Sequence, residues 1–291
     1  MKSRRDFLRN TSLMIAGGLV VPKVLTSAVM APSGKNVGLQ LYSMRDMIDK
    51  SGIQSVLEVV SKIGYKYLEA AGYSEGKIYG LAPADFKKRV DDLGMKCTSS
   101  HLGHNYSKEK EAEVMKWWSQ AIDTHHKIGV NYMIQASMPV NERSKLDELK
   151  TYCDYFSTVG GLTAAAGIAF GYHNHTSEFR KIGDQVILDF MLGNVNKEKV
   201  CFELDVYWCQ EGGADPVEYL KKYDGQFKLT HIKDAKEIGA SGKMDFKAIF
   251  EQMYANKVKD WYVEIEEYTN NDPVDSARQS FEFLKKARYV K

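Results

Sequence analysis

Apolar, strand-like segments alternate with amphipathic, helix-like segments eight times along this chain of 291 residues. The first unit is typical, because residues 37–42 form an apolar strand-like run and the next segment repeats apolar residues at helical spacing until Gly64. The expected strands begin at Val37, Tyr65, Met95, Val130, Ile168, Val200, Phe227 and Trp261. Since single helices separate them, the strands should pair in parallel through right-handed crossovers.

This repeat predicts an α/β fold, a (β/α)8 TIM barrel. Eight strand–helix units in about 260 residues match the usual size of that barrel. The main alternative, a doubly wound open sheet, would place a glycine-rich turn after an early strand, and the chain contains no GxGxxG. No linker or low-complexity segment interrupts the repeat, so we predict one barrel domain over residues 31–291.

The first 30 residues have a different character. Ser3-Arg-Arg-Asp-Phe-Leu-Arg9 resembles a twin-arginine export motif, and a moderately apolar stretch follows at residues 13–25. Thr26-Ser-Ala28 supplies small residues for cleavage. The alternative is an amphipathic helix with a chance Arg-Arg pair. We expect residues 1–30 to be an export signal that sends the folded chain to the periplasm.

Composition limits the classes of partner. A net charge of +2 argues against a nucleic-acid binder held mainly by phosphate contacts. Beyond the N-terminal segment, no apolar run approaches the roughly 20 residues that span a bilayer, so we expect no transmembrane domain in the mature chain. The four cysteines contain no CxxC pair and are expected as buried free thiols, with a disulfide as the alternative. The oligomeric state stays open, a homo-oligomer included.

Polar and ionisable side chains gather where the expected strands end, which is where a barrel of this type carries catalytic groups. Residues two apart on one strand share a face, so each close pair should point the same way. Four consecutive strands end in His, Asp or Glu, and buried unpaired charges cost several kcal/mol each. A divalent metal removes that cost. The residues are Gln40, Tyr42, Glu69, His101, His173, His175, Glu178, Glu203, Asp205, His231, Lys233, Glu264 and Glu266.

These strand ends resemble the xylose-isomerase-like TIM barrels, the sugar phosphate isomerase/epimerase group, over nearly the whole mature chain. In that family a divalent ion, often Mn²⁺, is held by a Glu, an Asp, a His and a second Glu. The resemblance implies Asp205, His231 and Glu264 as the last three ligands, with Glu266 as the alternative to Glu264. The motifs are Gly38-Leu-Gln-Leu-Tyr-Ser43, Tyr172-His-Asn-His175, Glu178-Phe179, Leu204-Asp-Val-Tyr-Trp208, His231-Ile-Lys-Asp234 and Val263-Glu-Ile-Glu266.

The first ligand position departs from the family pattern. The usual Glu-Asn-His is His173-Asn174-His175 here, so His173 takes the place of the glutamate, and Glu178 is the alternative source of a carboxylate. In the epimerases the two metal-bound glutamates also shuttle the proton, so this change weakens the case for simple two-base epimerisation. The chain also resembles 3-keto-glycoside lyases and 3-keto-sugar hydratases, which use a metal and a histidine.

We therefore predict a metal-dependent isomerase or epimerase that abstracts a proton next to the carbonyl of a carbohydrate, through a metal-stabilised enediolate. Mn²⁺ is the first expectation, with Zn²⁺, Co²⁺ and Mg²⁺ as alternatives. The alternative functions are a 3-keto-glycoside β-elimination lyase or hydratase on the same site, and a non-catalytic sugar-binding subunit. The candidate catalytic residues are His173, His175, Glu178, Lys233 and His101, and the candidate substrate contacts are Gln40, Tyr42, Glu69 and Trp208.

Two further features concern the helix expected over residues 107–128. His125 and His126 lie beside charged residues, and we expect both to be solvated. Trp117 and Trp118 should pack this helix on the barrel. An abasic-site endonuclease, which shares the barrel, is disfavoured because seven histidines are few for three zinc ions and the chain is nearly neutral.

Overall fold

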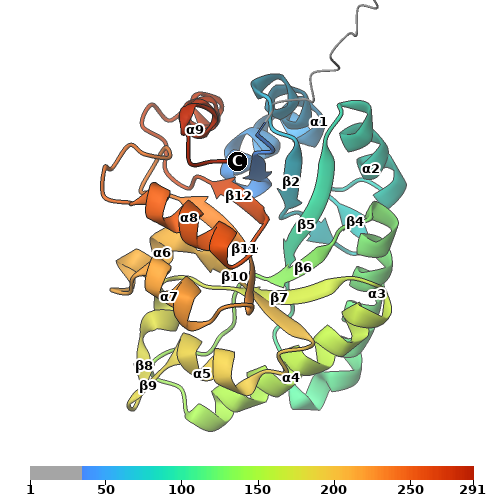
Figure 1. Cartoon of the computed structure of the whole chain (residues 1–291). Coiled ribbons are helices and arrows are strands. Elements are labelled where there is room, and N and C mark those ends of the chain that lie inside the picture. Colours follow the sequence, from blue (N-terminus) through green and yellow to red (C-terminus); the bar gives the residue numbers. More distant parts are fainter. Residues whose placement is uncertain (1–34) are drawn as a thin grey trace, which may run out of the picture. The chain divides into compact units, whose positions relative to one another are not determined.

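The computed structural model describes residues 35–291, in which eight parallel strands close into a barrel in the order β1-β12-β11-β10-β7-β6-β5-β2 (Figure 1). This confirms the predicted (β/α)8 barrel. The predicted export signal, residues 1–30, lies outside the described residues. The barrel strands are β1 (Gly38–Gln40), β2 (Tyr67–Ala70), β5 (Lys96–Leu102), β6 (Tyr132–Gln135), β7 (Ala169–His173), β10 (Val200–Asp205), β11 (Phe227–Lys233) and β12 (Asp260–Glu264).

Helices surround the strands on the outside of the barrel (Figure 1). They are α1 (Arg45–Ile63), α2 (Pro83–Asp92), α3 (Glu111–Ile128), α4 (Leu146–Ala165), α5 (Ile187–Asn194), α6 (Val206–Glu211), α7 (Pro216–Lys222), α8 (Phe246–Ala255) and α9 (Pro273–Lys286). Short 3-10 helices are η1 (Leu41–Met44), η2 (Lys108–Lys110) and η3 (Thr176–Phe179). Within residues 35–291, none of these helices combines the length and apolar character needed to cross a membrane.

Two small antiparallel hairpins were not predicted. They pair β3 (Tyr73–Ser74) with β4 (Lys77–Ile78), and β8 (Lys181–Ile182) with β9 (Gln185–Val186). Each strand has only two residues, which is too short for a hydrophobic alternation to reveal it.

The start of the barrel differs from the predicted boundaries. β1 ends at Gln40, whose side-chain oxygen accepts a hydrogen bond from the Tyr42 backbone and begins η1. Tyr42 is therefore on a helical turn and not on the strand. The next helix begins at Arg45 and is interrupted at Gly52, which has φ 77° and ψ 160°. Glycine adopts that φ readily, so Gly52 allows a kink inside one long α1.

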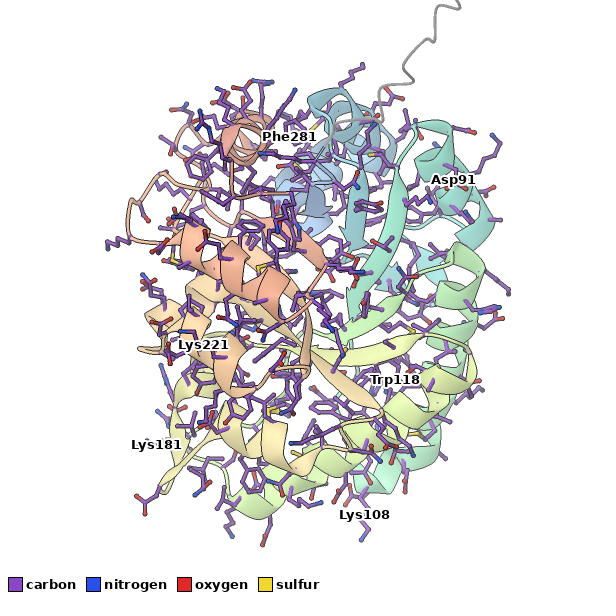
Figure 2. All side chains as sticks on the ribbon, in the orientation of Figure 1. Asp91, Lys108, Trp118, Lys181, Lys221 and Phe281 are labelled. Carbon is purple, nitrogen blue, oxygen red and sulfur yellow. The ribbon has the colours of Figure 1, made fainter. Side chains whose placement is uncertain are left out.

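Aromatic packing joins the helices to the barrel. Trp118 in α3 is fully buried, donates a hydrogen bond of 2.5 Å to the Tyr155 hydroxyl in α4 and meets Phe170 of β7 edge-on. Figure 2 labels Trp118 within the outline of the molecule and Lys108 at its lower edge. The prediction that this tryptophan packs α3 on the barrel is confirmed.

His125 corrects one prediction. It was expected to be solvated, but it is fully buried, with Nδ1 2.7 Å from the Ala121 carbonyl and Nε2 3.0 Å from the Ser100 hydroxyl. The prediction was wrong because the charged neighbours lie on the opposite side of α3, whereas His125 faces β5. His126 is exposed, as expected. The four cysteines, Cys97, Cys153, Cys201 and Cys209, are buried and free, which also agrees with the prediction.

Candidate metal centre and active site

Along three neighbouring strands, β10, β11 and β12, every second side chain points into the barrel. Towards the N-terminal ends the inward residues are apolar, and Ile134, Cys201, Leu229 and Tyr262 pack into one buried cluster. We call this cluster the floor. Two residues further along β10, β11 and β12 the inward side chain is ionisable, because residues two apart share a face. The inward series are Cys201–Glu203–Asp205 on β10, Leu229–His231–Lys233 on β11 and Tyr262–Glu264 on β12.

Strand register brings these residues side by side. Glu203 is level with His173, Asp205 with His231, and Lys233 with Glu264. Gly171, two residues before His173, lies beside the floor, where an added Cβ would come within 2.7 Å of Ile134 and 3.0 Å of Cys201 Sγ. The absence of a side chain there lets β7 approach its neighbours and bring His173 into the cluster.

His231 is the central residue of the site. Its Nε2 lies 2.5 Å from Glu69 Oε2 and 3.3 Å from Glu203 Oε2. Its Nδ1 lies on the other side, 3.2 Å from Glu264 Oε2 and 3.9 Å from Asp205 Oδ2. One imidazole thus contacts carboxylates at two depths of the barrel.

Two more imidazoles surround the same carboxylates. His173 Nδ1 lies 3.1 Å from Glu203 Oε2, and His101 Nε2 lies 2.6 Å from the same oxygen. The His101 ring stacks on that of His231 with centroids 4.9 Å apart, and the His173 ring centroid is 4.6 Å from that of His231. Three strands therefore supply histidines to one buried cluster.

The donor atoms form two overlapping groups of four residues, with all atoms of a group within 4.8 Å of one another. The upper group is His173, Asp205, His231 and Glu264. The lower group is His101, His173, Glu203 and His231. The upper group brings together the three ligands implied by the family resemblance and His173 in the place of the glutamate. Among the described residues, Glu178 and Glu266 fall in neither group.

The upper group fits a divalent metal ion. Oδ1 of Asp205 accepts a hydrogen bond from the Trp208 backbone, but its buried Oδ2 has no hydrogen-bond partner among the described residues. An unsatisfied buried carboxylate oxygen is costly, and an ion would satisfy it. Two imidazole nitrogens and two carboxylate oxygens are a suitable donor set for Mn²⁺, Co²⁺ or Zn²⁺.

Burial and neighbouring charges shift the pKa values of the residues in the upper group, often in opposite directions. Burial raises the pKa of Asp205 to about 7, although Lys233 and His231 act against it. Burial, together with His231 and two other histidines, holds the pKa of His173 well below its usual value. Burial alone would raise the pKa of Glu264, but Lys233 and His231 outweigh it and place that pKa well below the usual value. His173 is therefore neutral and Glu264 ionised near neutral pH, the forms in which both bind metals.

Lys233 is a buried cation beside the upper group. Its Nζ donates a hydrogen bond of 2.9 Å to Glu264 Oε2, another to Glu266 Oε1, and lies 4.8 Å from the Trp208 ring centroid. Burial would lower the pKa of Lys233, but Glu264, Asp205 and Glu266 outweigh it and raise that pKa above its usual value. The lysine keeps its positive charge at the rim of the site.

The predicted substrate contacts lie at different depths. Gln40 and Glu69 are fully buried, and Gln40 Nε2 donates a hydrogen bond of 2.8 Å to Glu69 Oε2. Ser99 donates another, of 2.6 Å, to Glu69 Oε1. Tyr42 is 45% exposed, with the Arg45 guanidinium 4.7 Å from its ring centroid. Tyr42 therefore faces the open end, whereas Gln40 and Glu69 support the site from below.

Glu178 holds the turn that follows β7. It accepts hydrogen bonds from the Tyr172 hydroxyl and the His175 backbone, both at 2.8 Å, and from the Ser177 hydroxyl at 3.0 Å. This turn keeps the partly exposed His175 ring 4.8 Å from that of His173 and 6.3 Å from that of Trp208. Glu178 thus fixes the backbone of His175, and this places the His175 ring beside the upper group.

The sequence predicts no separate role for Glu203, and the one signal in it is the position of Glu203 two residues before Asp205 on the same face of β10. Its Oε2 contacts three imidazoles, and its buried Oε1 has no hydrogen-bond partner among the described residues. The chain therefore carries a second layer of ionisable groups beneath the upper group.

A cavity of about 640 Å³ lies at the opposite, N-terminal end of the barrel. Its lining includes Tyr67, Lys96, Asp260 and Tyr262, at or near the starts of three strands, and none of the upper or lower group. Catalytic groups of this fold lie at the other end, so we do not assign the cavity to the reaction.

Comparison with known proteins gives consistent matches over the barrel. A family profile described as xylose isomerase-like TIM barrel matches residues 57–287. A crystal structure described as a sugar phosphate isomerase/epimerase from Parabacteroides distasonis ATCC 8503 is 38% identical and superposes with a TM-score of 0.83. That match covers 89% of this chain and 100% of the other.

More distant matches include other activities. An inosose dehydratase of Geobacillus kaustophilus is 22% identical over 214 residues, covering 66% of this chain and 66% of that protein, just under two thirds of its length. The crystal structure of the IOLI protein with a zinc atom shares the fold, at 16% identity, a TM-score of 0.66 and coverage of 85% and 95% of the two chains. With most of its barrel matched, the chain belongs to the xylose isomerase-like TIM barrel family.

Proposed function

We propose that this protein is a divalent-metal-dependent enzyme that removes a proton next to the carbonyl of a carbohydrate, and that it acts as an isomerase or epimerase. The observation that carries this proposal is the upper group, in which two imidazoles and two carboxylates converge and Asp205 Oδ2 has no hydrogen-bond partner among the described residues. Membership of a family with sugar isomerases and epimerases supports the substrate class.

His173, Asp205, His231 and Glu264 would hold the ion. When bound, a divalent ion supplies a Lewis acid that polarises a carbonyl and a neighbouring hydroxyl. Two imidazole nitrogens favour Mn²⁺, Co²⁺ or Zn²⁺ over Mg²⁺, which prefers an all-oxygen set that includes water. Mn²⁺ stays the first expectation, and the zinc in the IOLI structure makes Zn²⁺ the next one to test.

The residues around the upper group have separate tasks in this proposal. His175 is partly exposed and adjoins His173, so we assign it the transfer of the substrate proton. Lys233 places a positive charge beside the oxygen that becomes negative when the proton leaves. The Trp208 ring, at the same rim, and the exposed Tyr42 offer apolar faces to a sugar ring.

A second candidate is β-elimination or hydration on a 3-keto sugar at the same site. Elimination begins with the same proton removal and ends with loss of the substituent on the neighbouring carbon. Hydration is the reverse, in which water adds to the unsaturated ketone and a proton returns to the carbon next to the carbonyl. His173 favours this candidate, because an imidazole now stands where the family has one of its two proton-shuttling glutamates. The match to an inosose dehydratase is consistent with it. A non-catalytic sugar-binding subunit is the alternative in a different class.

The test is solvent exchange. The Mn²⁺-loaded and Zn²⁺-loaded protein is incubated in D2O with keto-hexoses and 3-keto-glucosides, with Asp205→Ala as the control. Deuterium in the recovered or rearranged sugar supports the isomerase or epimerase, and release of the substituent supports the lyase. Stabilisation by a sugar without exchange or turnover would instead identify a binding subunit.

A further inference from the structure

Glu203 lies beneath the upper group and is contacted by histidines from three other strands. Its Oε2 is 2.6 Å from His101 Nε2, 3.1 Å from His173 Nδ1 and 3.3 Å from His231 Nε2. The side chain is fully buried, and Oε1 has no hydrogen-bond partner among the described residues. A buried carboxylate of this kind is costly to keep, so it needs a function.

One function to consider is a second metal ion in the lower group. His173 and His231 belong to both groups, and a neutral imidazole has one lone-pair nitrogen and one N–H nitrogen. To hold two ions, both rings would have to lose the N–H proton as well and bridge the metals. In addition, His231 Nε2 already lies 2.5 Å from Glu69 Oε2. These contacts fit hydrogen bonds below a single ion better than a second ion.

We propose that Glu203 is a positioning residue that sets the tautomer of His173 for the ion in the upper group. It accepts the Nδ1–H of His173, which leaves the Nε2 lone pair for the ion. Glu69 acts on His231 in the same way through Nε2–H, which leaves Nδ1 on the side of Asp205 and Glu264. Carboxylates behind ligating histidines orient the ring and increase its basicity. This inference rests on the metal site proposed above.

The inference also accounts for the imidazole at position 173. A carboxylate ligand offers two equivalent oxygens, either of which can bind a metal. A neutral imidazole binds a metal through one nitrogen only when its proton is on the other nitrogen. Glu203, level with His173 on the adjacent strand, supplies the acceptor that fixes this proton. His101 helps to hold that acceptor in place through its own contact with Glu203 Oε2.

The test compares Glu203→Gln with the wild type and with Glu237→Gln. Glu237 is also buried but accepts hydrogen bonds from Thr269 and Ser276, away from both groups. Each protein is stripped of metal and titrated with Co²⁺ and Zn²⁺ against a chelator. Metal per chain, the Co²⁺ absorption spectrum and the unfolding midpoint of the apo-protein are recorded.

We expect one ion per chain in all three proteins. Glu203→Gln should bind it about 10- to 100-fold more weakly and change the Co²⁺ spectrum. Glu237→Gln should lower the unfolding midpoint of the apo-protein but leave the affinity and the Co²⁺ spectrum unchanged, so a loss of stability alone does not account for weaker binding.

Wild-type affinity and spectrum in Glu203→Gln would overturn the inference but leave the metal site standing. Two ions per wild-type chain, with one lost in Glu203→Gln, would also overturn it and assign the lower group to a second ion. A wild type that binds no ion would overturn both the metal site and the role of Glu203.

Discussion

Lys233 and Glu264 form an ion pair inside the barrel, with Nζ 2.9 Å from Oε2 and both side chains almost completely buried. The pair joins neighbouring positions of β11 and β12. It lies between the upper group, to which Glu264 belongs, and the rim, where Lys233 contacts Glu266 and Trp208.

Replacing Lys233 by Met should destabilise the apo-protein by about 3 kcal/mol, because removal of one partner leaves a buried charge without compensation. Denaturant unfolding of the metal-free protein measures this. Lys221→Met is the matched control, since Lys221 pairs with Glu218 at 2.8 Å on the exposed surface and should have a much smaller effect. Equal losses in the two variants would contradict the role given to the buried pair.

Metal removal should lower the stability of the wild type but not of Asp205→Ala. An ion present at about 100 times its Kd adds about 2.7 kcal/mol to the free energy of unfolding. The measurement is denaturant unfolding with metal and with excess chelator, together with elemental analysis. A chelator effect of the same size in Asp205→Ala would remove Asp205 from the ligand set.

His173→Glu restores the residue type of the family. It also replaces the imidazole that now lies 3.1 Å from Glu203 Oε2 by a second carboxylate. We expect this single variant to bind metal poorly, since two carboxylates would face each other in a buried site. His173→Glu combined with Glu203→Gln should recover much of the affinity. A metal titration of all four proteins gives the coupling between the two positions, and additive effects would contradict direct contact.

His125 should make folding sensitive to acid. Burial lowers its pKa in the folded protein to about 4 from the ordinary 6.5, so the unfolded chain binds the proton more readily. Its contribution is complete above pH 6.5 and is lost as the pH falls towards 4, by about 3 kcal/mol in total. The free energy of unfolding between pH 4 and pH 7 should therefore rise more steeply in the wild type than in His125→Gln. His126→Gln, at the exposed neighbour, is the control.

Export by the twin-arginine route remains our proposal for residues 1–30. Changing Arg4 and Arg5 to lysine in the full chain should keep the protein in the cytoplasm, whereas the wild type should reach the periplasm. Cell fractionation with cytoplasmic and periplasmic marker proteins measures this. A wild type found only in the cytoplasm would contradict the proposal.

The barrel could be predicted from the sequence because each strand–helix unit repeats one local pattern, and the strand ends then had to meet at one end of the barrel. The period of two placed Asp205, His231 and Glu264 among the residues expected at the strand ends, and the family resemblance singled out these three, which the structure brings together. The register between two strands cannot be derived from the sequence of either strand alone. The pairing of Glu203 with His173 is therefore known only from the closed barrel. The local sequence also led to a wrong prediction of exposure for His125, because charged neighbours on one face of α3 do not show whether the opposite face is buried.

The floor of Ile134, Cys201, Leu229 and Tyr262 has a kinetic consequence. These buried side chains fill the barrel below the ionisable groups, so the reaction chamber is closed at its inner end. In the enzyme proposed above, a substrate and the product made from it would share one opening, at the C-terminal ends of the strands. Release of the product would then have to precede entry of the next substrate.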